Sequence, residues 1–111
     1  MSQTAIDLVH LARQSGGDAE LERELLTLFA QQCARQLRAI HAGDASVGRD
    51  AAHTLKGAAR AIGAWQVAEA ADRIEQQLTV VGAAPREDAL DALTLAAAEA
   101  RAVISRLDCA A

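Results

Sequence analysis

The chain has 111 residues, close to the usual size of one domain, and 51% of them are hydrophobic, which is enough for a single core. Its formal net charge of −4 does not favour a nucleic-acid partner, and no apolar run is long enough to span a membrane. Cys33 and Cys109 are too few for a disulfide framework and no signal peptide is visible, so we expect reduced thiols and a cytoplasmic protein.

The first third of the chain predicts two helices. A short helix is expected over residues 4–14, with Thr4 as its N-cap, and Ser15-Gly16-Gly17 should end it. A longer helix follows Asp18, a favourable N-cap residue, and stops at Gly43-Asp44. Its apolar positions recur at helical spacing, at Leu25, Leu26, Phe29, Cys33, Leu37 and Ile40.

The rest of the chain predicts three more helices. The third covers about residues 45–62 and ends at Gly63. The fourth is expected over about 64–81 and is followed by the turn Gly82-Ala83-Ala84-Pro85, with Pro85 as the first residue of the fifth helix. Apolar residues recur in steps of three and four, at 64, 67, 71, 74, 78 and 81 and then at 90, 93, 97, 100, 104 and 107. With no strand-like alternation, the prediction is an all-α antiparallel four-helix bundle with a short additional N-terminal helix across one end.

The third predicted helix has two different faces. At about 100° per residue, His53 lies opposite the apolar face, and Arg49, Lys56 and Arg60 lie within about 60° of it on one side. Gly57 lies about 40° away on the other side. The apolar face consists of Ala51, Ala52, Leu55, Ala58, Ala59 and Ile62.

Two residues beside His53 go against the preferences of the rest of the chain. Gly57 in mid-helix costs roughly 1 kcal/mol relative to alanine, and it lies on the histidine face rather than on the packed face. Lys56 is the only lysine among eleven basic residues. Such exceptions gathered at one place are expected at functional sites, so we interpret Gly57 as clearance for a partner and Lys56 as a required compact charge.

The stretch His53-Thr54-Leu55-Lys56-Gly57-Ala58-Ala59, followed by Gly63 and by Ala71-Asp72-Arg73-Ile74-Glu75, resembles the histidine-phosphotransfer (HPt) domain of two-component phosphorelays. Ile74 stands where this family usually has leucine, and the upstream helix with Leu28-Phe29 also fits, so residues 1–111 are interpreted as one HPt domain. The resemblance implies that His53 accepts a phosphoryl group, that Lys56 stabilises it and that Gly57 leaves space for the partner. The implied partner is a response-regulator receiver domain, whose phospho-aspartate and Mg²⁺ complete the site.

The residues around His53 fit this chemistry. A neutral imidazole is a good nucleophile, and neighbouring cations disfavour imidazolium and would later stabilise a phosphohistidine. The chain has no GxxxxGK[ST] or GxGxxG loop and no obvious acidic cluster for Mg²⁺, so we expect no bound cofactor, no metal site and no kinase activity of its own. We therefore predict a phosphocarrier that exchanges phosphoryl groups reversibly between receiver aspartates and His53 Nε2. A hybrid histidine kinase is a further candidate partner. The start methionine and the full-length bundle favour a free-standing protein, and a monomer is expected because a histidine helix that partners must visit should stay exposed.

Other interpretations stay open from the sequence alone. A non-phosphorylated bundle that serves as an adaptor or docking domain is the main alternative. A metal- or cofactor-holding bundle would need inward-facing Glu and Glu-x-x-His pairs, which are not apparent.

Arg49 and Arg60 are candidate partner contacts or simply solvated charges. Trp65 is expected to be a core or interhelical anchor. His10 and His41 are interpreted as ordinary surface or boundary residues. Five other charged residues are interpreted as parts of solvated faces: Glu69, Asp72, Arg73, Glu75 and Glu99.

Overall fold

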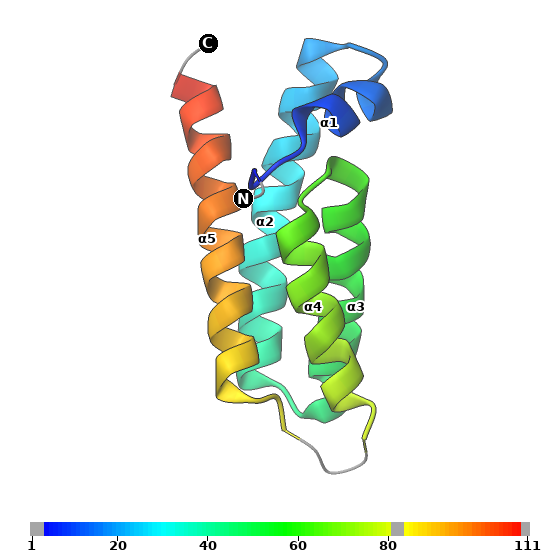
Figure 1. The fold of residues 1–111 in the computed structure, drawn as a ribbon, viewed down its shortest axis with the longest axis vertical. Coiled ribbons are helices and arrows are strands. Elements are labelled where there is room, and N and C mark those ends of the chain that lie inside the picture. Colours follow the sequence, from blue (N-terminus) through cyan, green and yellow to red (C-terminus); the bar gives the residue numbers. More distant parts are fainter. Residues whose placement is uncertain (1–3, 81–83, 110–111) are drawn as a thin grey trace.

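The computed structural model describes residues 4–80 and 84–109, which form five α-helices and contain no strand (Figure 1). Helices α2 to α5 run alternately up and down along the long axis, and α1 lies across one end of them. The predicted all-α bundle with a short additional N-terminal helix is therefore confirmed. The helices are α1 (Leu8–Ser15), α2 (Ala19–Ala42), α3 (Ala45–Ile62), α4 (Trp65–Leu78) and α5 (Glu87–Cys109).

The boundaries of α2 and α3 lie where the sequence predicts them. The Asp18 carboxylate accepts hydrogen bonds from the first-turn backbone of α2, and the Asp44 carboxylate accepts one from the backbone of Val47 at 2.9 Å. These contacts satisfy N–H groups that the first turn of a helix leaves without an intrahelical partner. Gly63 ends α3 in the left-handed conformation (φ +83°), which a residue with a side chain rarely adopts.

The prediction for the first helix is wrong at its start, because a tertiary contact decides where it begins. Asp7, not Thr4, is the N-cap: its carboxylate accepts from the His10 backbone N–H at 3.0 Å. Its own N–H donates to the Gly63 carbonyl at 2.9 Å, which ties the start of α1 to the end of α3. The helix therefore begins at Leu8 and ends at Ser15, next to the predicted Gly16-Gly17 break.

The turn between α4 and α5 also differs from the prediction. Helix α4 ends at Leu78 rather than at residue 81, and α5 begins at Glu87 rather than at Pro85. The Arg86 carbonyl accepts the first i→i−4 hydrogen bond of α5, and its N–H donates to the Gln77 side chain at 3.0 Å, so Arg86 rather than Pro85 precedes the first helical residue. Residues 81–83 of the predicted helix and turn lie outside the described residues.

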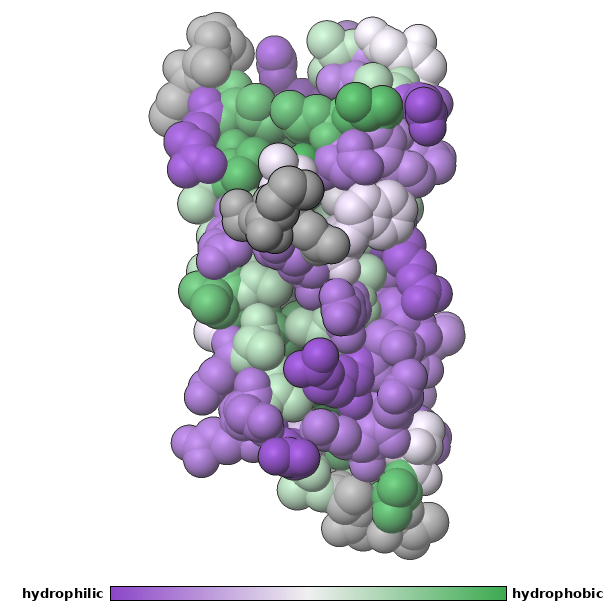
Figure 2. Space-filling model, in the orientation of Figure 1, coloured by the Kyte–Doolittle hydropathy of each residue, from purple (hydrophilic) through white to green (hydrophobic). Residues whose placement is uncertain are grey.

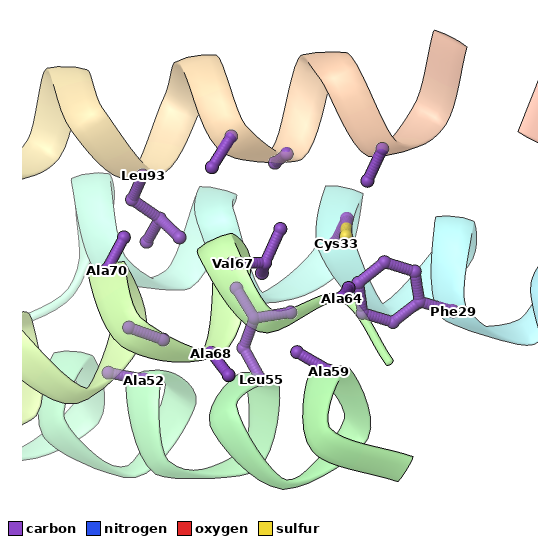
Figure 3. Close-up of a cluster of buried hydrophobic side chains, with 14 of the residues drawn as sticks. Phe29, Cys33, Ala52, Leu55, Ala59, Ala64, Val67, Ala68, Ala70 and Leu93 are labelled. Carbon is purple, nitrogen blue, oxygen red and sulfur yellow. The ribbon is translucent and has the colours of Figure 1, made fainter. Parts of the chain in front are cut away.

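The core is built from small and medium aliphatic side chains (Figure 3). Leu55 of α3, Val67 of α4 and Leu93 of α5 point inward, and alanines line the seam where α3 and α4 pack. The predicted buried face of α3 is confirmed, with Ala58 half-buried and the other five residues buried. Within the described residues, no helix combines the length and apolar character of a membrane span.

The outer surface is uneven in polarity. Hydrophilic residues cover the side formed by α3 and α4, whereas hydrophobic residues gather near the end of the bundle where α1 lies (Figure 2). Leu8 and Val9 of α1 are both more than half exposed. Helices α3 and α4 also carry the candidate site.

Candidate functional site

His53 lies in the middle of α3 on its solvent face, where its helical position predicts it. Its side chain is 69% exposed, while Ala52 and Leu55 on the opposite face are fully buried. The helix therefore fixes the histidine backbone through its buried face and leaves the imidazole accessible. No part of the described chain covers the ring.

The imidazole is held by a carboxylate from the neighbouring helix. His53 Nδ1 lies 2.9 Å from Oε2 of Glu75 on α4, and the Glu75 side chain is only 20% exposed. An ionised carboxylate can only accept a hydrogen bond, so the proton of the neutral ring is placed on Nδ1. The Nε2 lone pair is then free, and among the contacts of the described residues it has no partner.

Lys56 joins the same carboxylate and a second one. Its Nζ lies 2.7 Å from Glu75 Oε1 and 3.2 Å from Asp72 Oδ1, and the lysine side chain is 14% exposed. The hydrogen bond to Glu75, and then that to Asp72, raise the pKa of Lys56 above its ordinary value. The same contact with Lys56 is the main reason that the pKa of Glu75 is lowered, so both groups are charged at neutral pH.

A fifth side chain extends this arrangement along α4. The Gln76 amide donates from Nε2 to Asp72 Oδ2 at 2.9 Å, one turn apart on the same helix. Gln76, Asp72, Lys56, Glu75 and His53 thus form a continuous chain of polar contacts, here called the α3–α4 network. It fixes the imidazole and the ammonium relative to each other.

The interpretation of Asp72 and Glu75 as solvated charges is wrong, because both are partners of the histidine helix. The contact partners lie 16 and 22 residues apart in the sequence, so the wheel of one helix cannot reveal them. The available signal was the spacing of three between these two acids, which places them on one face of α4. That face could be assigned to His53 only once the packing of α3 on α4 was known.

Gly57 is exposed, and a Cβ built on it would meet nothing within 4 Å. The packing of the described chain therefore does not require glycine there. Gly48, on the buried face of the same helix, is the opposite case, because a Cβ would lie 3.0 Å from Leu78 Cδ1. Gly48 thus permits the close approach of α3 and α4, a role that the pattern of one helix alone does not indicate.

Arg49 and Arg60 are both exposed on α3. Neither guanidinium makes an ion pair or contacts the imidazole in the parts of the chain that the structure describes. The structure therefore brings together His53 and Lys56 through Glu75, and leaves the two arginines pointing into solvent. Their role as partner contacts stays a prediction.

Trp65 is an interhelical anchor, as expected, but it lies at the surface rather than in the core. Its Nε1 donates to Asp7 Oδ2 at 3.1 Å, and its ring packs edge-on against His10 with centroids 4.8 Å apart. The indole hydrogen bond is the main reason that the pKa of Asp7 is lowered. This cluster fastens α1 to the junction of α3 and α4, where Gly63 leaves room for Asp7.

The fold and the site together define a helical module that presents one carboxylate-bound histidine to solvent. The chain matches the family model of the Hpt domain over residues 24–106, and it belongs to that family. It is thus a phosphotransfer domain of two-component signalling; Hpt domains are phosphocarrier modules rather than kinases and interact with response-regulator receiver domains. The match contains α3 and α4 entirely and leaves α1 outside. Searches of curated proteins and of solved structures gave no significant match.

Proposed function

We propose that this chain is a phosphorelay intermediate that accepts a phosphoryl group on His53 from a receiver aspartate and passes it to another receiver. The observation that carries the proposal is the hydrogen bond from His53 Nδ1 to Glu75, because it directs the unprotonated Nε2 of an exposed ring outward.

The transfer step follows from this geometry. The Nε2 lone pair attacks the phosphorus of the aspartyl phosphate; the N–P bond forms while the P–O bond breaks, and the receiver carboxylate leaves. The ring gains positive charge as the N–P bond forms, and the Glu75 carboxylate at Nδ1 neutralises that charge or accepts the proton. In the reverse direction the protonated ring is the better leaving group, so the same contact supports both directions.

The neighbours of His53 have separate tasks in this proposal. Lys56, three residues along the helix, supplies an ammonium on the same face to bind the phosphoryl oxygens. Gly57 leaves the approach to Nε2 uncrowded, and Arg60 and Arg49 contact the receiver. Mg²⁺ comes with the receiver, where it neutralises the phosphoryl group of the aspartate.

The proposed setting is the cytoplasm, with receivers and a hybrid histidine kinase as partners of a monomer. A histidine that several partners must reach in turn benefits from staying outside any permanent interface. The exposure of His53 and the open space beside Gly57 support this arrangement.

The test is incubation of the chain with a phosphorylated receiver and Mg²⁺. We expect a label that is labile in acid and stable in base, which His53→Gln abolishes and which His41→Gln, at an exposed histidine of α2, leaves intact. Lys56→Ala should slow transfer and shorten the life of the phosphohistidine without unfolding the bundle. Failure of every receiver from the source organism to label the wild-type chain would instead favour the adaptor interpretation.

A further inference from the structure

Lys56 is bound to more negative charge than it can neutralise. One ammonium faces the carboxylates of both Glu75 and Asp72, so with a neutral His53 the α3–α4 network carries one net negative charge before any phosphoryl group arrives. A phosphoryl group on Nε2 would add further negative charge. The lysine that should bind this group is therefore already occupied.

The two carboxylates do not hold Lys56 equally. Glu75 is the closer and more buried partner, at 2.7 Å and 20% exposure, and its other oxygen binds the imidazole. Asp72 lies at 3.2 Å, is 34% exposed, and has its other oxygen bound to Gln76. The ammonium can leave Asp72 for a phosphoryl oxygen while it keeps Glu75, whereas leaving Glu75 would disturb His53 as well.

We propose that Asp72 is a positioning residue that competes with the phosphoryl group for Lys56, and so shortens the life of the phosphohistidine and shifts transfer toward the receiver. This inference rests on the proposed function. When Nε2 is phosphorylated, Lys56 Nζ exchanges Asp72 Oδ1 for a phosphoryl oxygen, and Asp72 remains nearby as an unneutralised charge that disfavours the phosphorylated state. The chain is thereby built to pass the group on rather than to store it.

The test compares Asp72→Asn with wild type after both are labelled by the same phosphorylated receiver. Asparagine keeps an oxygen that can accept from Lys56 but removes the competing charge. We expect the phosphohistidine half-life, and the equilibrium ratio of phosphohistidine to phospho-receiver, each to rise about two- to fivefold, the size typical of a partly exposed charge pair. Asp91→Asn removes the same charge from an exposed position on α5, which does not pack on α3, and should leave both quantities unchanged.

A second comparison shows whether Asp72 acts through the lysine. In a Lys56→Ala background the competition no longer exists, so Asp72→Asn should change the half-life by less than it does in wild type. An equal effect in both backgrounds would overturn the proposal, as would a half-life that Asp72→Asn leaves unchanged or shortens. Thermal unfolding of each variant shows whether the bundle is intact. Absence of label on the wild-type chain would refute the proposed function itself. If the wild-type chain is labelled and Asp72→Asn has the same phosphohistidine half-life as wild type, only this inference is refuted.

Discussion

Replacing Gly57 should make the bundle more stable and a poorer phosphoryl acceptor. The residue is exposed in mid-helix, and an added Cβ meets nothing within 4 Å, so alanine or glutamine fits without strain. Alanine is favoured over glycine at such a position by roughly 0.8–1 kcal/mol. With an unfolding entropy of about 2.1 cal/mol/K per residue over 111 residues, this corresponds to a rise in melting temperature of about 4 °C.

The functional consequence is opposite in sign. Residue 57 lies one turn after His53 on the same exposed side of α3, so in the proposed function a glutamine there would occupy space that a receiver needs to reach Nε2. We expect Gly57→Gln to lower the rate of transfer by about tenfold or more, which corresponds to a loss of at least ~1.4 kcal/mol of transition-state stabilisation. Gly57→Ala should gain stability with a much smaller loss of rate.

Melting curves followed by circular dichroism and single-turnover transfer from a labelled receiver measure the two effects. Gly48→Ala is the matched glycine control: its Cβ would lie 3.0 Å from Leu78 Cδ1, so it should not bring the stabilisation expected at Gly57. Ala98→Gln places the same bulky side chain on an exposed position of α5 and should leave transfer unchanged. A Gly57→Gln variant that accepts phosphoryl groups at the wild-type rate would refute the clearance argument.

Three further predictions concern other parts of the molecule. Glu75→Ala should slow phosphorylation of His53 by roughly threefold to tenfold, because the hydrogen bond that fixes the exposed ring is lost and an ordinary hydrogen bond contributes about 0.5–1.5 kcal/mol. A rate equal to wild type would contradict the tautomer argument. Asp7→Asn should be less stable than wild type at neutral pH. The Trp65 hydrogen bond holds the pKa of Asp7 below its ordinary 3.8, so this stability is present above that value and is lost as the pH falls through the lowered pKa. The difference in melting temperature should therefore vanish in acid, and a difference that is constant with pH would contradict the assignment. Burial raises the pKa of the Cys33 thiol to about 11, so this thiol should resist alkylation at pH 8 until the protein unfolds. Rapid labelling of every thiol in the native state would contradict its place in the core.

Most of the fold follows from the sequence because the signals are local. Asp18, Asp44 and Gly63 determine helix ends through hydrogen bonds or backbone conformation within a few residues, and these boundaries are confirmed. The start of α1 could not be predicted in this way. Asp7 becomes the N-cap where the chain is also tied to Gly63 and to Trp65, contacts that span more than fifty residues. The local capping preference that favours Thr4 does not include such distant contacts.

The site likewise has a part that one helix predicts and a part that depends on the packing of two helices. The exposure of His53 and the position of Lys56 beside it follow from the period of one helix, and so does the placement of Gly57 away from the packed face. The carboxylates that act on these residues come from another helix, and their assignment depends on the register in which α4 packs against α3. A sequence pattern identifies which side chains share a face, but not which face of a neighbouring helix meets it.

The alanine content of the chain links its core to its chemistry. On α3, Ala52 and Ala59 are fully buried, and Ala68 of α4 is nearly so, and the two backbones pack across a seam of these small side chains (Figure 3). Small residues at a helix contact allow the axes to approach closely. That approach lets Glu75 span the rim of the seam and reach both the imidazole and Lys56. Larger residues in the seam would separate the helices and break these contacts, even if the motif around His53 stayed the same. In the proposed function, the buried face of α3 therefore also contributes, because it sets the distance at which α4 acts on the histidine.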